Sequence, residues 1–235
     1  MSKVKISVII PTFNRAEYLA ECLDSLLEQT IKPYQIIVVN NGSNDNTLGV
    51  VPKDRNISIL RNETNRGKGH SIKKGVLKSK NDLILFMDSD LATPMKELDN
   101  LYAYIKNGYD VVIASRALKQ SIITVKQPKY RQLAGQTFPF LVRFLTPLSL
   151  KDTQCGFKLL KRAAAQKIFK RLTIDRFAFD VEMLYIAQKL GYKIAEVPVT
   201  WIDQKGSKVK IIRDSIKMFF DLIKIRLNDF LGKYN

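Results

Sequence analysis

Two carboxylates one residue apart follow a short apolar run near the middle of the chain. Leu83 to Met87 are five consecutive apolar residues, and Asp88 and Asp90 come directly after them. Such a run is too short to span a membrane but is typical of a parallel strand that is buried on both faces. At the end of that strand both carboxylates could converge on one hard cation, which commonly shares its oxygen ligands with substrate phosphates. The pattern therefore predicts a Mg²⁺ or Mn²⁺ site for a nucleotide diphosphate, and a turn that contains two Asp residues by coincidence is the alternative.

Similar apolar runs recur along the first half of the chain and alternate with segments of helical periodicity. We expect strands at 6–10, 36–39, 57–60, 83–87 and 110–114. We expect helices after Asn14, which can act as an N-cap, after the glycine-rich loop 65–70, and from Pro94 to Asn107. This alternation predicts an α/β fold with a mostly parallel central sheet that helices cover on both faces.

Polar residues follow four of the expected strands. They are residues 12–14, 40–43, 88–90 and 115–116. Ligands of such sheets bind at the carboxyl ends of the strands, so we expect these four segments to face one crevice.

The second half of the chain has weaker patterns. Residues 118–130 are basic and read as an irregular segment, while 138–150 are apolar but interrupted by Pro139, Arg143 and Pro147. The apolar stretch predicts either a segment at a membrane interface or an ordinary core helix. Residues 209–235 predict a basic amphipathic helix that packs on the catalytic domain, 1–208, or anchors it at a membrane.

The overall charge favours polyanionic partners. The 235 residues include 39 Lys and Arg against 22 Asp and Glu, which gives a formal net charge of +17. Phosphates, an anionic membrane surface and nucleic acid all fit this charge. Cys22 and Cys155 lack redox or metal spacing, and no stretch reads as a signal peptide or a membrane span. We therefore expect a cytoplasmic protein that associates with the membrane peripherally.

Several motifs in fixed order resemble a known family. Residues 7–15, 38–43, 65–69 and 88–90 look like the motifs of family 2 glycosyltransferases. Ser115-Arg116 and residues 152–158, 179–182, 197–201 and 206–208 resemble the polyprenyl-phosphate branch of that family, first the dolichyl-phosphate β-glucosyltransferases and next the dolichyl-phosphate mannose synthases. The resemblance covers roughly residues 4–230 and implies a nucleotide-diphospho-sugar transferase (Rossmann-like) fold. It also implies metal-dependent transfer of one sugar to a lipid-linked phosphate.

The resemblance also implies roles for particular residues. It assigns catalysis to Asp90, Arg116, Arg131 and Asp180, with Asp88 and Asp90 on the metal. It assigns binding of the nucleotide sugar to Pro11, Thr12, Asn14, Asn40, Asn41, Lys68, Asp88, Lys205 and Lys208. The two arginines would receive the acceptor phosphate, because a guanidinium fork binds phosphate at two points.

The chemistry of the acceptor separates three possible functions. A lipid phosphate is already anionic, so it could displace the nucleotide diphosphate with inversion and without a general base. A saccharide or protein hydroxyl would need a base, for which Asp152 or Asp180 are the candidates. A non-catalytic module that binds membrane or nucleic acid would explain the charge, but it gives no reason for Asp88 and Asp90 beside a glycine loop. We expect the first function, without nucleic acid as a partner, and the oligomeric state stays open.

One departure from the family motif bears on the donor. The family usually has Asp-Asp-Gly-Ser where this chain has Asn40-Asn41-Gly42-Ser43. An amide can accept a hydrogen bond from uracil N3-H and donate another, whereas the guanine edge offers donors only. The paired asparagines therefore favour a uridine nucleotide, with glucose as the expected sugar.

Overall fold

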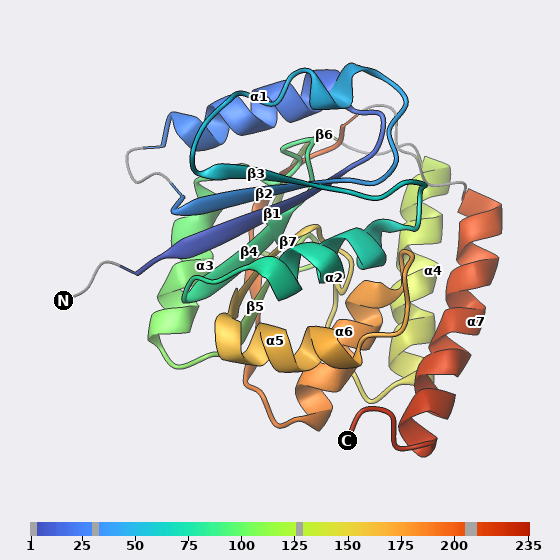
Figure 1. The fold of residues 1–235 in the computed structure, drawn as a ribbon. Helices are drawn as coiled ribbons and strands as arrows, with labels where there is room; N and C mark the ends of the chain where they lie inside the picture. Colours follow the sequence, from blue (N-terminus) through green and yellow to red (C-terminus); the bar gives the residue numbers. More distant parts are fainter. Residues whose placement is uncertain (1–3, 30–32, 126–128, 205–210) are drawn as a thin grey trace.

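The computed structural model describes residues 4–29, 33–125, 129–204 and 211–235, with the backbone alone at 129–136 and 211–212 (Figure 1). The strands are β1 Ile6–Thr12, β2 Gln35–Asn40, β3 Ile57–Arg61, β4 Leu83–Met87, β5 Val111–Ser115, β6 Ile122–Val125, β7 Phe157–Lys161, β8 Ile194–Pro198 and β9 Thr200–Ile202. The α-helices are α1 Ala16–Leu27, α2 Lys68–Lys78, α3 Glu97–Lys106, α4 Lys129–Leu145, α5 Arg162–Arg171, α6 Phe179–Lys189 and α7 Ile211–Phe230. A single 3₁₀ turn, η1, spans Asn46–Leu48.

The described residues form one large sheet in the order β3-β2-β1-β4-β7-β5-β8. Every neighbouring pair is parallel except those that β7 makes with β4 and β5. The prediction of a mostly parallel sheet is therefore confirmed. The antiparallel strand β7, which lies between two strands that precede it in the sequence, was not predicted.

Helices cover the sheet on both faces, as the sequence predicted. One buried cluster joins the sheet to α1 and α3, and the other joins it to α2, α4, α5, α6 and α7 (Figure 1). Strand β4 lies between the two clusters with all five residues buried. This double burial explains why its sequence is uniformly apolar instead of alternating.

The prediction of an irregular segment at 118–130 was wrong. Ile122 to Val125 form β6, which pairs in parallel with β9 in a second, two-stranded sheet, and α4 begins at Lys129. The branched residues of β6 suit a strand, but both sides of it are largely exposed, so no alternating pattern marks it.

The role of Asn14 as an N-cap was also wrong. Helix α1 begins at Ala16 after Arg15, which makes no side-chain capping bond. Asn14 has a φ of 50°. Its Nδ2 donates to Asn44 Oδ1 over 2.8 Å, and its Oδ1 accepts from the Asn44 amide over 3.0 Å. The side chain therefore joins the loops after β1 and β2 instead of capping α1.

Helices α4 and α7 lie side by side and each exposes aromatic residues (Figure 1). Phe138 and Val142 of α4 and Met218, Leu222 and Ile225 of α7 enter the core. The side chains left exposed are Phe140 and Phe144 of α4 and Ile216, Phe219, Phe220, Ile223, Leu227 and Phe230 of α7, with Leu231 beyond it. Each helix therefore packs on the core by one side and presents an apolar side outward, and contact of that apolar side with a membrane stays a prediction. Among the described residues, no helix combines the length and apolar character needed to cross a bilayer.

The two sides of α7 should respond differently to truncation. Leu222 is fully buried and Leu227 is 56% exposed. We expect Leu222→Ala to lower the free energy of unfolding by about 2–5 kcal/mol, because it leaves a cavity. Leu227→Ala, the matched control, should change it by less than about 0.5 kcal/mol. Urea denaturation measures both, and similar losses would contradict the orientation of α7.

Candidate active site

The two carboxylates after β4 lie at the carboxyl edge of the sheet. The Asp88 amide donates to the Gly156 carbonyl over 3.1 Å, and Asp90 Oδ1 accepts from the Ala92 amide over 3.2 Å. Burial and the neighbouring Asp88 both raise the pKa of Asp90. Two ionised carboxylates this close repel each other, so the site favours binding of a cation.

Lys68 supplies a positive charge to this pair. Its Nζ lies 2.6 Å from Asp88 Oδ1. Burial lowers the pKa of Lys68, but Asp88, Asp180 and Asp90 outweigh burial and leave the pKa above its ordinary value. Gly67 precedes it with a φ of 107°, and a Cβ there would lie 2.3 Å from the Asp175 carbonyl oxygen. Glycine is therefore required to bring the start of α2, and with it Lys68, to the site.

The asparagines after β2 hold the loop that leads to α2. Asn41 Oδ1 accepts from the Arg66 amide and from Asn62 Nδ2, both over 3.0 Å, and Asn41 Nδ2 donates to Asn65. Asn40 Oδ1 accepts from the Ser43 amide over 3.0 Å. The side-chain amide of Asn41 thus forms its hydrogen bonds within the protein. Recognition of the nucleotide base by Asn40 and Asn41 stays a prediction.

Thr12 points a polar group into the same region. It ends β1 opposite Asn40, and its buried Oγ1 has no hydrogen-bond partner among the described residues. A buried hydroxyl without a partner costs free energy, so its place suits a ligand atom. Pro11 lies one residue earlier in the same strand.

Arg116, which follows β5, is fixed by Asp152. Its Nε and Nη2 donate to the two carboxylate oxygens over 2.6 and 2.8 Å, and its amide donates to Oδ2 over 3.0 Å. Burial would raise the pKa of Asp152, but Arg116 outweighs it and lowers the pKa to about 2. The guanidinium also lies over the Trp201 ring, 5.4 Å from its centroid. One edge of the guanidinium is therefore taken, and Nη1 is left for a ligand.

Lys158 and Asp180 form a fully buried ion pair near Lys68. Lys158 Nζ, in β7, is 2.5 Å from Asp180 Oδ1 and 2.6 Å from the Cys155 carbonyl oxygen. Both side chains are buried. Burial raises the pKa of Asp180, and Lys158 and Lys68 oppose that rise. Asp180 lies in the first turn of α6, which begins at Phe179 and has no side-chain capping bond.

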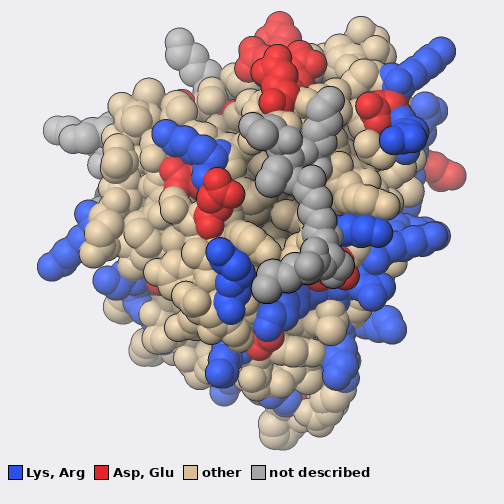
Figure 2. Space-filling model, turned by 90° about the vertical axis from the view of Figure 1, so that its left-hand side faces the viewer, with Lys and Arg blue, Asp and Glu red and all other residues tan. Residues whose placement is uncertain are grey.

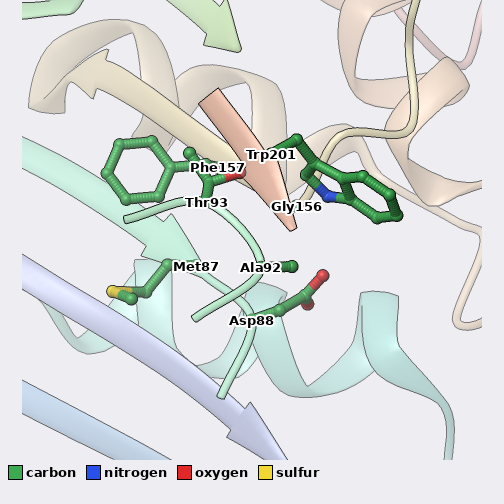
Figure 3. Close-up of a pocket in the computed structure, with 7 residues that line it drawn as sticks. All are labelled: Met87, Asp88, Ala92, Thr93, Gly156, Phe157 and Trp201. Carbon is green, nitrogen blue, oxygen red and sulfur yellow. The ribbon is translucent and has the colours of Figure 1, made fainter. Parts of the chain in front are cut away.

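Residues 152–158 contact Arg116, Asp180 and Asp88. Asp152 fixes Arg116, and Lys158 lies beside Asp180. Gly156 packs on Asp88 so closely that a Cβ would lie 1.9 Å from Asp88 Oδ2. In Figure 3 the Asp88 carboxylate and the Trp201 indole point to one side of a small pocket, and Met87 and Phe157 point to the other.

The structure thus gathers most of the predicted residues at one edge and adds others. Lys205 and Lys208 lie outside the described residues, and the Arg131 backbone lies in α4. Sequence reasoning missed Lys158, Gly156 and Trp201 as parts of the site, although all three lie in motifs that carried the resemblance. Within the described ranges, no three potential ligands from His, Cys, Asp or Glu cluster around a metal position. Asp88 and Asp90 alone fit an ion that takes its remaining ligands from substrate phosphates and water.

Comparison with protein families and solved structures agrees with this geometry. The model of the family "Glycosyl transferase family 2" matches residues 7–169. The chain therefore belongs to glycosyltransferase family 2.

Its relatives include proteins named dolichyl-phosphate beta-glucosyltransferase. The one from Dictyostelium discoideum is 37% identical, across 99% of this chain and 77% of that protein. The one from Homo sapiens is 34% identical, across 98% of this chain and 77% of that protein.

Solved structures support the fold. Mannosyl-3-phosphoglycerate synthase from Rubrobacter xylanophilus has a TM-score of 0.71 at 19% identity, across 98% of this chain and 75% of that one. Glucosyl-3-phosphoglycerate synthase from Mycobacterium tuberculosis, in complex with Mn²⁺ and uridine diphosphate, has a TM-score of 0.67 at 16% identity, across 97% and 80%. The predicted nucleotide-diphospho-sugar transferase fold is confirmed.

The Arg116–Asp152 pair should make stability depend on pH. The pKa of Asp152 is about 2 in the folded protein, against 3.8 for an ordinary Asp side chain. Its contribution is therefore present above pH 4 and is lost as pH falls towards 2. We expect Asp152→Asn to cost about 2 kcal/mol at pH 7, and about half as much at pH 3. Urea denaturation at both pH values checks this, and a cost that does not change with pH would contradict it.

Proposed function

We propose that this protein transfers glucose from UDP-glucose to a polyprenyl or dolichyl phosphate, with inversion and with Mg²⁺ or Mn²⁺. The observation that carries the proposal is the Asp88 and Asp90 pair beside Lys68, at the sheet edge of a chain similar over its length to dolichyl-phosphate beta-glucosyltransferases. The product would be a lipid-linked sugar for glycosylation.

On the donor side, Asp88 and Asp90 would hold the divalent ion. When bound, that ion neutralises the charge that grows on the departing nucleotide diphosphate. Lys68 keeps a second positive charge next to Asp88 and, through α2, a fixed position relative to the loop after β2. The Thr12 hydroxyl and Asn40 face the same edge and would contact the nucleotide.

On the acceptor side, the properties of Asp152 favour a phosphate over a hydroxyl. Asp152 is bound at two points by Arg116 and has a pKa of about 2, so it is a poor general base. Asp180 is held by Lys158 in a buried pair. A lipid phosphate needs no base, and Arg116 can offer Nη1 to it while Asp152 fixes the other edge. Arg131 would be the second arginine at this phosphate.

The acceptor would be reached at a membrane surface. Phe140 and Phe144 are 60% and 77% exposed and stack with their centroids 6.4 Å apart, and Phe230 is 89% exposed. Basic residues of α7, the helix that contains Phe230, would add attraction to anionic lipid, and they include Arg213 and Arg226. We infer peripheral association with the cytoplasmic face of a membrane.

The proposed metal role predicts the effect of one substitution. Asp90→Asn should abolish transfer of radiolabelled glucose into the lipid extract and the enhancement of donor binding by Mn²⁺, because the change removes one of the two carboxylates proposed to hold the ion. The fold should stay intact by circular dichroism. Asp99→Asn, an exposed change in α3, is the control and should behave as wild type. Near-normal turnover by Asp90→Asn in excess Mn²⁺ would exclude the role.

The proposed base pocket predicts nucleotide selectivity. With Mn²⁺ present, UDP should bind more tightly than GDP in calorimetry, since Asn40 offers an amide where the family motif has a carboxylate. A clear preference for GDP would instead move the proposed donor towards GDP-mannose.

A further inference from the structure

A second hollow lies outside the candidate active site. It has a volume of about 320 Å³ and lies between α7 and the segment that precedes α6. The side chains that matter here are Arg176, Lys217, Lys224, Phe220, Asp175 and Asp221. None of them takes part in the proposed transfer reaction.

Three cations converge on this hollow. Arg176, Lys217 and Lys224 are exposed, and in the described part of the chain none of them makes a hydrogen bond or a close ion pair. All three nevertheless lie close enough for their charges to act on Asp221. Long cationic side chains that surround one hollow without a partner are suited to an anion.

The two carboxylates of the hollow leave this positive character in place. Asp175 is already engaged, with Oδ2 3.8 Å from Arg66 Nη2 and Oδ1 3.4 Å from His70 Nδ1. Burial raises the pKa of Asp221, and Lys224, Arg176 and Lys217 work against that rise. Asp175 therefore has partners outside the three cations of the hollow. Within the hollow, the three positive charges of Arg176, Lys217 and Lys224 exceed the single negative charge of Asp221.

The hollow also borders an apolar surface. Phe220 lines it and is 62% exposed, and Ile216 and Ile223 lie on neighbouring turns of α7 with 55% and 36% exposed. A phosphate group next to exposed apolar side chains is the chemistry of a phospholipid at the surface of a bilayer.

We propose that this hollow binds the phosphate of an anionic phospholipid headgroup while Phe220 and its apolar neighbours on α7 enter the acyl region. Arg176 can bind the phosphate at two points, and Lys217 and Lys224 add point charges. The proposal rests on the membrane association given under the proposed function, and it adds a defined lipid site to it. Asp175 contacts Arg66, in the loop before α2, and His70, in the first turn of α2, so this lipid site lies next to the start of the helix that carries Lys68.

The competing explanation for binding to anionic lipid is a general attraction by the whole basic surface, because positive charge is spread widely over the molecule. In Figure 2, which shows another side of the molecule, Lys and Arg side chains extend over much of the face. A test must therefore remove equal charge at two places.

The experiment compares two triple variants of the full chain. The first is Arg176→Ala with Lys217→Ala and Lys224→Ala. The charge-matched control is Arg55→Ala with Lys53→Ala and Lys80→Ala, three exposed residues away from α7. Sedimentation with vesicles of phosphatidylcholine and phosphatidylserine measures binding. The first triple should weaken binding by at least about tenfold and the control by less than about threefold. Equal weakening, or no effect of the first triple, would overturn the proposal.

Two further arms separate the sources of phosphate and of apolar contact. Phe220→Ser should also weaken binding to these vesicles, and an unchanged affinity would contradict insertion beside the hollow. If the first triple loses binding only to phosphatidylcholine vesicles that contain polyprenyl phosphate, the hollow serves the acceptor and the proposal is wrong. Transfer to polyprenyl phosphate in detergent should persist in the first triple. Absence of transfer by the wild type would refute the proposed function and leave the vesicle result standing.

Discussion

The pairing of buried charges is the constraint on which the site depends. Asp88 and Asp90 lie half-buried at the edge of the sheet, and Asp180 is fully buried near them, where an uncompensated carboxylate is costly. The chain offsets them with Lys68 from α2 and Lys158 from β7. Losing Lys158 would leave Asp180 buried and unpaired, whereas water partly screens the pair of Lys68 with Asp88, which is 36% exposed.

The segment 152–158 extends this pairing from donor to acceptor. Its carboxylate fixes Arg116, its glycine gives room to Asp88, and its lysine reaches Asp180. Seven consecutive residues thus fix the positions of side chains that would contact the donor and the acceptor. Their relative positions depend on a short loop and the start of β7 more than on any single helix.

Patterns among neighbouring residues predicted many of the strands and helices, but they did not predict contacts between residues far apart in the sequence. The apolar run 83–87 matches the bounds of β4, and the helix expected after the glycine-rich loop 65–70 is α2, which begins within that loop at Lys68. The pair Arg116–Asp152 spans 36 positions, and Lys158 is a residue type usually found at the surface, so no local pattern marks either as a buried partner. Strand β6 was missed because its partner, β9, is also distant and both are short. Roles for Arg131, Lys205 and Lys208 still rest on the resemblance.

The antiparallel insertion of β7 has a consequence for how the chain acquires its structure. Strands β4 and β5 are both made before β7, yet neither can pair with the other, because β7 belongs between them. During synthesis from the N-terminus, β4 keeps one edge and β5 both edges with unsatisfied backbone groups until residue 161 has emerged, because β8 is made later still. The nascent sheet therefore cannot join β5 to the four strands made first, and the arrival of one short strand joins them before Asp180 and Trp201 are added to the site.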